Sequence, residues 1–335
     1  MKFVIAVAAA ATCALAKTLQ TPSSLDYQYL QFASLFNKHT HSLDEYNDRM
    51  TEFGKTQKFI ADHNAKMDTH FLGHNAYSDW TDEERAEFLS SGIVGELKDH
   101  EHIQHHYARL NTEYIPAQVN WVEHGAVSAV RHDLATCSAS WAHAALDAIE
   151  GDIYLKTGKM EQLSVQQVLD CDHLSWGCHG GLYTNAFEYA LETPLMTEKD
   201  YPYTGKPQKC AYDKTKGKAR VTNFINVLPH DADQLKVAVK LGPVAASITT
   251  SSKLFQFYKG GIISSHECST ETTPVDSAVT IVGYGHDHHL NMEYWLIKNS
   301  WGTTWGDHGF ARIAITEHGA GVCNIQTEAS VVFTD

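Results

Sequence analysis

Two side chains near the middle of the chain could form a nucleophile and base pair. Ser140 supplies a hydroxyl and His143 an imidazole, and helix spacing would put both on nearly the same face. Ser140 would need that base, since an alcohol ionises far less readily than a thiol. In the alternative interpretation, which we favour, Ser140 is a helix N-cap and His143 is a partly buried side chain that fills core volume.

The residues after Ser140 have the pattern of a long helix that would position both side chains. Large and small apolar residues recur at helical spacing from Ser140 to Lys156, and Thr157-Gly158 follows as a stop signal. Short β-type segments separated by Gly and Pro come later, at residues 221–227, 244–248, 278–282, 294–298 and 310–315. Helices first and strands later predict an α+β protein with a barrel-like sheet and a cleft between two halves.

Composition limits the class of protein and its partners. The chain has 335 residues, 43% of them hydrophobic, which is ample for a buried core. Its net charge of −14 argues against nucleic acid or an anionic membrane as a partner. The 21 histidines would offset much of this charge on acidification, or they are scattered surface residues without a common role. We expect a monomer with no cofactor and no metal.

The N-terminus has the features of a secretory signal peptide over residues 1–16. One Lys precedes an apolar run from Phe3 to Leu15, which ends in Ala14-Leu15-Ala16. A run this short does not cross a bilayer core about 30 Å thick, so we expect the secretory pathway, with a secreted or lysosomal/vacuolar product. Six cysteines remain after Cys13, and an even number in an oxidising compartment suits three disulfides, in any of 15 pairings.

Three segments resemble the active site of the papain-like cysteine proteases, in particular a cathepsin L-like zymogen with a degenerate site. They are Cys137-Ser138-Ala139-Ser140-Trp141, Val275-Asp276-Ser277-Ala278 and Lys298-Asn299-Ser300-Trp301-Gly302. In that family the first reads Cys-Gly-Ser-Cys-Trp and the second Asp-His-Ala. The resemblance therefore puts Ser140 at the nucleophile position, Ser277 at the position of the base, and Asn299 at that of the residue that orients the base.

The proton acceptor and the oxyanion donor of the family are both replaced. A serine at 277 does not accept a proton near neutral pH as an imidazole does. His286, His288 and His289 lie nine or more residues further on, too far along a strand to substitute. The family's oxyanion Gln falls on Leu134 when counted back from Cys137, or on Asp133 when counted forward from Val130, and neither supplies an amide.

The resemblance also implies substrate-binding residues and a disulfide pairing. Gly180 and Gly181 would line a groove in which an extended peptide pairs with main-chain groups, or they only serve the turn beside Cys178. Asp276 and Trp301 are assigned to substrate binding with them, although Trp301 is equally a core residue. The family pairing is Cys137–Cys178, Cys171–Cys210 and Cys268–Cys323. It uses every exported thiol, whereas an active relative keeps one more, the catalytic cysteine.

Residues 17–114 resemble the inhibitor-type helical pro-region and linker of such zymogens. One helical face carries Glu45, Arg49, Phe53, Ile60 and Asn64, and a second motif reads Gly73-x-Asn75-x-Tyr77-x-Asp79. The linker from Ser90 to Glu113 contains His100, His102, His105 and His106, and we do not favour a metal site there because no second cluster with ligand spacing supports it. The papain-like peptidase domain would span residues 115–335, as a helical lobe and a β-barrel-like lobe.

Three functions fit these observations. The leading hypothesis is a catalytically impaired pseudopeptidase that binds a peptide or protein ligand, its own pro-region or protein inhibitors in the cleft. The first alternative is an active cathepsin L-like endopeptidase that uses a non-standard nucleophile and base. The second alternative is a structural or storage protein. The first two differ in whether the chain has a proton acceptor beside Ser140.

Overall fold

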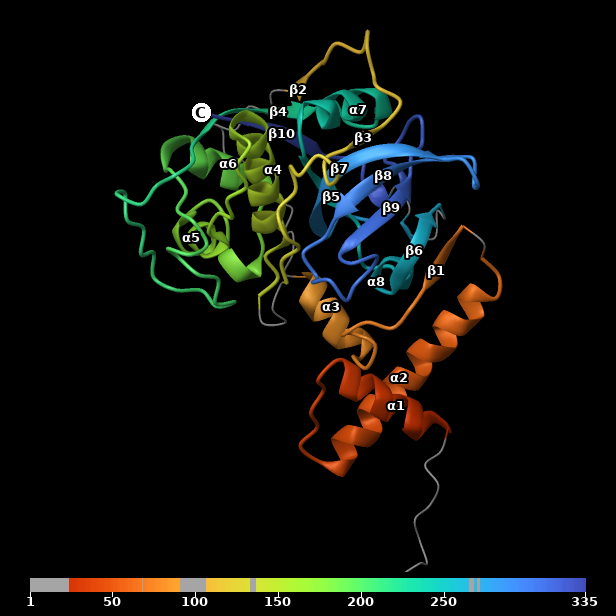
Figure 1. The fold of residues 1–335 in the computed structure, drawn as a ribbon. Helices are drawn as coiled ribbons and strands as arrows, with labels where there is room; N and C mark the ends of the chain where they lie inside the picture. The colour runs from red at the N-terminus through yellow and green to blue at the C-terminus, as the bar shows by residue number, and fades with distance from the viewer. Residues whose placement is uncertain (1–23, 68, 91–106, 133–136, 265–267, 270–271) are drawn as a thin grey trace, which may run out of the picture.

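A computed structural model describes residues 24–67, 69–90, 107–132, 137–264, 268–269 and 272–335 (Figure 1). Several sequence predictions fall outside these residues: the signal peptide, the linker histidines His100, His102, His105 and His106, and the oxyanion positions Asp133 and Leu134. Within the described part, no helix is both long and apolar enough to cross a membrane.

The N-terminal unit, residues 24–90, contains three helices and a short strand: α1 (Ser24–Leu35), α2 (Leu43–Asn64), β1 (His70–Leu72) and α3 (Asp82–Ser90). The predicted face of α2 does connect these elements. Arg49 makes a two-pronged ion pair with Glu84 of α3, with Nη2 to Oε1 at 2.7 Å. Asn64 exchanges two hydrogen bonds with the main chain of Leu72, at 2.8 and 2.9 Å.

The N-terminal unit docks on the rest of the chain through main-chain pairing and aromatic contact. Strand β1 pairs antiparallel with β6 (Tyr258–Ile263). Asn75 donates its Nδ2 to the carbonyl of Gln256 at 2.7 Å, so the second predicted motif lies at this junction. The ring of Tyr77 meets that of Trp301 with centroids 5.9 Å apart.

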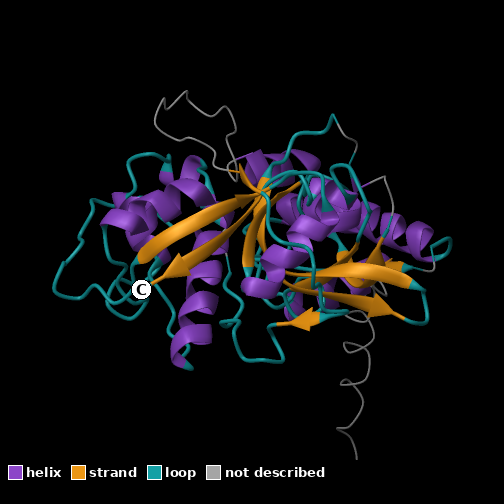
Figure 2. Ribbon diagram, turned by 90° about the horizontal axis from the view of Figure 1, so that it is seen from above, coloured by secondary structure: helices purple, strands orange, loops and turns teal. Residues whose placement is uncertain are grey.

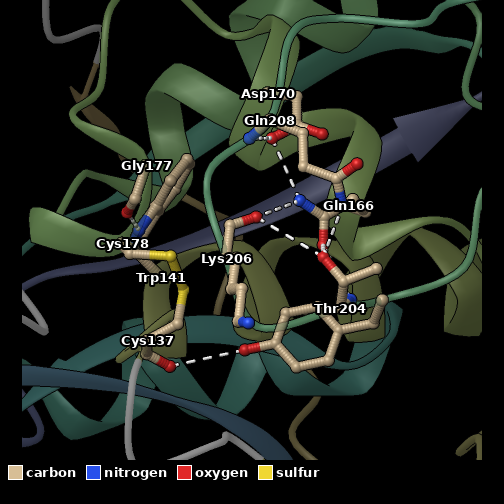
Figure 3. The surroundings of a disulfide bond; sticks show 10 residues. Cys137, Trp141, Gln166, Asp170, Gly177, Cys178, Thr204, Lys206 and Gln208 are labelled. Atoms are coloured by element: carbon tan, nitrogen blue, oxygen red, sulfur yellow. Dashed lines mark hydrogen bonds between the residues drawn. A yellow bond between two sulfur atoms is a disulfide. The ribbon is translucent and has the colours of Figure 1, made fainter.

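The helical lobe is built on α4 (Ser140–Thr157), flanked by α5 (Val165–Cys171) and α6 (Tyr183–Glu192). The predicted long helix is confirmed, and it ends at Gly158, whose φ of 69° suits a glycine C-cap. Figure 3 shows the disulfide Cys137–Cys178 beside Trp141, whose Nε1 donates to the carbonyl of Gly177 at 3.2 Å. All three family-implied disulfides are present, with Cys171–Cys210 also in this lobe and Cys268–Cys323 in the sheet lobe.

The second lobe is a ten-stranded mixed sheet in the order β1-β6-β9-β8-β7-β5-β10-β4-β2, with β3 paired to β7. Figure 2 shows its strands between helices on either side. Its remaining elements are β2 (Tyr107–Ala108), β3 (Val119–Asn120), β4 (Val221–Val227), α7 (Ala232–Leu241), β5 (Val244–Ile248), α8 (Lys253–Gln256), β7 (Ser277–Asp287), β8 (Met292–Lys298), β9 (Phe310–Ala314) and β10 (Ala329–Thr334). The α+β two-lobed fold is as expected. The five predicted strands are present as β4, β5, β7, β8 and β9, whereas β6, β10 and the short strands β1, β2 and β3 were missed.

A buried charge network joins the two lobes. Lys298 at the end of β8 is 1% exposed, and its Nζ lies 2.9 Å from Oδ1 of Asp147 in α4. Arg131 contacts the same carboxylate and that of Glu150, one turn further along α4. Glu150 also accepts the main-chain N–H of Leu163 at 2.6 Å. Two cations and two carboxylates thus compensate one another away from water.

Removing one member of this network should destabilise the whole protein. We expect Lys298→Met to lower the free energy of unfolding by about 3–5 kcal/mol, because Asp147 loses a partner it cannot replace with water. Lys58→Met is the matched control, since Lys58 forms an i,i+4 pair with Asp62 at a side-chain exposure of 75%. That control should cost less than about 0.5 kcal/mol in chemical denaturation. Equal losses in the two variants would contradict the role given to the network.

The N-terminal unit should lose stability in acid through two histidines. Burial and the nearby His63 lower the pKa of His70 to about 4, and burial lowers the pKa of His74 to about 4. Unfolded histidines titrate near 6.5, so between about pH 4 and pH 6.5 the unfolded state binds more protons than the folded state. The stability that these two neutral imidazoles contribute is therefore complete above pH 6.5 and is lost as the pH falls toward 4.

Thermal unfolding followed from about pH 7.5 to 4.5 measures this effect. The double variant His70→Gln/His74→Phe, whose Phe can keep the stacking on Phe53 made at 4.5 Å, should show a flatter dependence than the parent. His318→Gln, at a side chain 81% exposed, is the control and should follow the parent. The same slope in all three proteins would rule out the two buried histidines as the cause.

Candidate active site

Ser140 is the first residue of α4 and is 1% exposed. Its Oγ accepts a hydrogen bond from the main-chain N–H of Ala278 in β7, at 3.3 Å. The N-cap is Ala139, with φ −116° and ψ 26°, whose own side chain makes no capping hydrogen bond. The prediction that Ser140 is the N-cap is therefore wrong, because the chain enters the helix one residue earlier and the hydroxyl faces the other lobe.

His143 fills core volume, as the favoured interpretation indicated, and is more completely buried than expected, at 2% exposure. Its ring packs edge to face on Tyr203, with centroids 5.5 Å apart. Tyr203 belongs to the helical lobe and donates its hydroxyl to the carbonyl of Cys137 at 3.3 Å. The imidazole thus contacts the helical lobe, whereas the hydroxyl of Ser140 contacts the sheet.

Ser277 begins β7, pairs with Ile248 of β5, and is 2% exposed. Ser140 accepts a hydrogen bond from Ala278, the residue after Ser277. The structure therefore brings the nucleophile position and the base position together across the two lobes. Chemically this pair is two hydroxyl groups. Neither is an acceptor for the other's proton near neutral pH, so the arrangement offers polar contacts without acid–base chemistry.

Asn299 follows β8 directly and is 1% exposed. Its Oδ1 accepts the main-chain N–H of Ser300 at 2.8 Å. Its Nδ2 has no hydrogen-bond partner among the described residues, although a buried amide donor left without an acceptor is costly. The strand register, with Thr280 opposite Lys298, brings Asn299 next to the start of β7, where Ser277 lies.

The two glycines assigned to a groove are also required by the local fold. Gly180 has φ 109°, a region that disfavours side chains, and its carbonyl accepts the N–H of Trp176 at 2.8 Å. A Cβ on Gly181 would lie 2.6 Å from Cβ of Ser175 and 2.7 Å from the ring of Trp141. Their role in binding substrate stays a prediction.

Asp276 and Trp301 make structural contacts beside the site. Asp276 accepts from the N–H and hydroxyl of Thr250 at 2.7 and 2.8 Å and from the N–H of Ser251 at 3.0 Å. Burial raises the pKa of its carboxyl, and these hydrogen bonds, which lower the pKa, offset only part of that rise. Trp301, 2% exposed, packs edge to face on Phe255 and is covered from the N-terminal unit by Tyr77 and Phe88.

Sequence reasoning missed the residues that fix this site in place. Asp147 and Glu150 are charged positions inside a helix that is otherwise rich in Ala, Leu and Ile, and such charges are buried only with partners. Charged residues among apolar ones were the sequence signal for a buried charge network, although this pattern does not identify Arg131 and Lys298 as the partners. No group of three or more His, Cys, Asp or Glu side chains suits a metal ion in the described ranges.

Comparison with known proteins identifies the family to which this fold belongs. Residues 115–333 match the family model described as papain family cysteine protease, and residues 29–85 match the cathepsin propeptide inhibitor domain. The chain is 35% identical to cysteine proteinase 15A of Pisum sativum over 324 residues, covering 92% of this chain and 86% of that protein. It is 34% identical to cathepsin L of Sarcophaga peregrina over 303 residues, 84% of this chain and 85% of that one.

Solved zymogens have the same architecture. The structure of digestive procathepsin L2 proteinase from the larval midgut of Tenebrio molitor superposes with a TM-score of 0.84 at 29% identity, covering 92% of this chain and 99% of that one. A recombinant stem bromelain precursor superposes with a TM-score of 0.82 at 27% identity, with coverage of 92% and 98%. The chain belongs to the papain family of cysteine proteases and is a cathepsin L-like member that carries a propeptide inhibitor domain.

Proposed function

We propose that this chain is a pseudopeptidase, a catalytically impaired papain-fold protein that binds polypeptide in its cleft without cleaving it. One observation carries the proposal: the hydroxyl at the nucleophile position accepts a hydrogen bond from the main chain of β7, and the base position beside it is a second serine. The proposal includes the boundaries given above, namely a signal peptide at 1–16, a pro-region at 17–114 and the papain-like domain from 115 onward.

The reaction would fail at its first step. Attack on a peptide carbonyl requires that the nucleophile lose its proton to a base, which later returns it to the leaving amine. The family's histidine position beside Ser140 is Ser277, and the ring of His143, the histidine one helical turn along α4, packs edge to face on Tyr203. The buried Nδ2 of Asn299, which has no hydrogen-bond partner in the part of the chain that the structure describes, supports this view, because an orienting residue remains where its family partner is replaced.

The same surroundings support binding. The glycine pair and the turn at Asp276 keep their main-chain geometry through contacts that do not involve the reactive positions. The chain's own pro-region is one partner, and peptides, proteins or protein inhibitors in the cleft are the others that this proposal assigns. A leader of the secretory type accords with a secreted or lysosomal product.

Hydrolysis of fluorogenic peptides from about pH 4 to 8 tests the proposal, with the purified protein assayed before and after limited proteolysis of the N-terminal unit. We expect no turnover above the uncatalysed rate and no labelling by thiol-directed probes, together with binding of a labelled non-cleaved peptide. Turnover that disappears in Ser140→Ala would establish the active endopeptidase instead. If the protein neither binds nor hydrolyses peptide, the result would favour a structural or storage protein.

Restoring the replaced groups should restore chemistry. We expect Ser140→Cys/Ser277→His to hydrolyse peptides, because a thiol then lies beside an imidazole that Asn299 can orient. A Gln at position 133 or 134 should add a further factor of about 10²–10³ in kcat by supplying the oxyanion donor.

Ser140→Cys alone is the matched control and should show far less activity, since the thiol lacks its base. An inactive triple variant that still folds and binds peptide would contradict the claim that only these positions separate the chain from an active peptidase.

A further inference from the structure

Two histidines, His286 and His288, lie side by side at the tip of the hairpin that β7 and β8 form (Figure 1). His286 is opposite Glu293 near the end of β7, and His288 is the first residue of the turn that follows. Both side chains are exposed. His286 is nine positions after Ser277 along β7, roughly 30 Å at the usual rise of a strand, so the pair lies apart from the candidate active site.

The two imidazole rings approach each other through the same nitrogen. Nδ1 of His286 lies 3.3 Å from Nδ1 of His288, whereas the ring centroids are 4.8 Å apart and the ring planes are inclined at 57°. The rings are therefore not stacked, and their Nδ1 edges face each other. Two nitrogen ligands at about 2.0–2.1 Å from a tetrahedral zinc ion are themselves about 3.3–3.4 Å apart. The spacing of the two nitrogens thus matches that of two ligands of one ion.

A hydrogen bond between the rings accounts for this contact in only one arrangement of protons. One Nδ1 must carry a proton and the other must be free, because two N–H groups or two lone pairs at this distance repel each other. A metal ion instead accepts the Nδ1 lone pairs of both neutral rings, and the proton of each ring is then on Nε2. A bound ion therefore uses both nitrogens in the same way, whereas the hydrogen bond requires them to differ.

Asp287, the residue between the two histidines, holds the backbone that carries them. Its Oδ1 accepts the main-chain N–H of His289 at 3.0 Å and that of Leu290 at 3.1 Å, which fixes the start of the turn. Its Oδ2 lies 2.9 Å from Nη1 of Arg312 in β9, which ties the hairpin to the next strand. Because the backbone on both sides of Asp287 is fixed, a ligand that contacts both rings has less chain entropy to overcome.

The charged groups around the pair already compensate one another. Glu293 forms an ion pair with Lys236 of α7, whose Nζ lies 2.8 and 2.9 Å from the two carboxylate oxygens. Asp287 pairs with Arg312 on β9. With each of these cations matched by a carboxylate, neither presents an uncompensated charge to a metal ion. Glu293 also has lone pairs left over, so it can accept a hydrogen bond from a water bound to that ion.

We propose that His286 and His288 chelate one divalent transition-metal ion through their Nδ1 atoms, with water in the remaining coordination positions. Imidazole suits zinc, copper and nickel, whereas magnesium and calcium prefer oxygen ligands. Two protein ligands agree with the finding that the described ranges contain no group of three or more His, Cys, Asp or Glu side chains suited to a metal. The site differs from the sequence-based expectation of no metal, and it does not depend on whether the cleft cleaves peptides.

The test follows the hairpin itself while metal is added. Zinc chloride is titrated into the isotopically labelled full chain, and the amide and imidazole signals of residues 284–294 are the readout. This local readout separates the pair from the other histidines, since the chain has 21 in all. We expect these signals to shift with zinc until one site is saturated. Magnesium chloride at the same concentrations should leave them unchanged, because this ion prefers oxygen ligands.

Variants assign the binding to the pair. His286→Gln and His288→Gln should each lower the affinity for zinc by about 10²-fold, because the second ligand of a chelate binds at high effective concentration. His289→Gln, at the next histidine along the turn, is the matched control and should keep the affinity of the parent. All three positions are exposed, and circular dichroism checks that each variant is folded.

Three results would overturn the proposal. One is that zinc leaves the signals of the parent hairpin unchanged, which would mean that a hydrogen bond alone joins the two rings. Another is that magnesium shifts the signals as zinc does, which would indicate attraction to carboxylates. The third is an affinity for zinc that His286→Gln and His288→Gln do not change, or that His289→Gln lowers equally, which would indicate adventitious binding to exposed histidines.

Discussion

The contact between the helical lobe and the sheet depends on one buried group of charges. Asp147 and Glu150 lie on the buried side of α4, and they are tolerated there because Arg131 and Lys298 reach them from outside the helix. Since Ser140 begins the same helix and Asn299 is the residue after Lys298, the network that fixes α4 against β8 also fixes the candidate active site. The candidate-site positions at Ser140 and Asn299 are thus fixed by buried charges at other positions.

Under the proposed function, this separation accounts for a papain-like site that keeps its setting while serines occupy the nucleophile and base positions. The bonds that hold the site together are mainly main-chain contacts and structural side chains, such as the Ala278 N–H to Ser140 and the turn held by Asp276. A serine in place of a thiol or an imidazole leaves these contacts intact. In the function we propose, the serines remove an ionisable pair on which hydrolysis depends and binding does not. A papain-like scaffold can therefore lose turnover and keep its cleft.

The sequence was sufficient where a local pattern decides the structure. Helix α4, with its Gly158 stop, strands β4 and β5, and the disulfides implied by the family were all predicted. Strand β6 was missed because Gly260 and Gly261 weaken its pattern, and pairing with β1 and β9 compensates. The N-cap was misassigned because only backbone dihedrals distinguish Ala139 from Ser140.

The central claim is that Ser140 has no proton acceptor able to make it a nucleophile. Incubation with an activated peptide ester, an acid quench and intact-mass analysis with peptide mapping tests it at the atom concerned. The account predicts that Ser140 remains unmodified at every time point, whereas Ser140→Cys/Ser277→His accumulates an acyl adduct on residue 140. An acyl group trapped on Ser140 of the unaltered chain would contradict it.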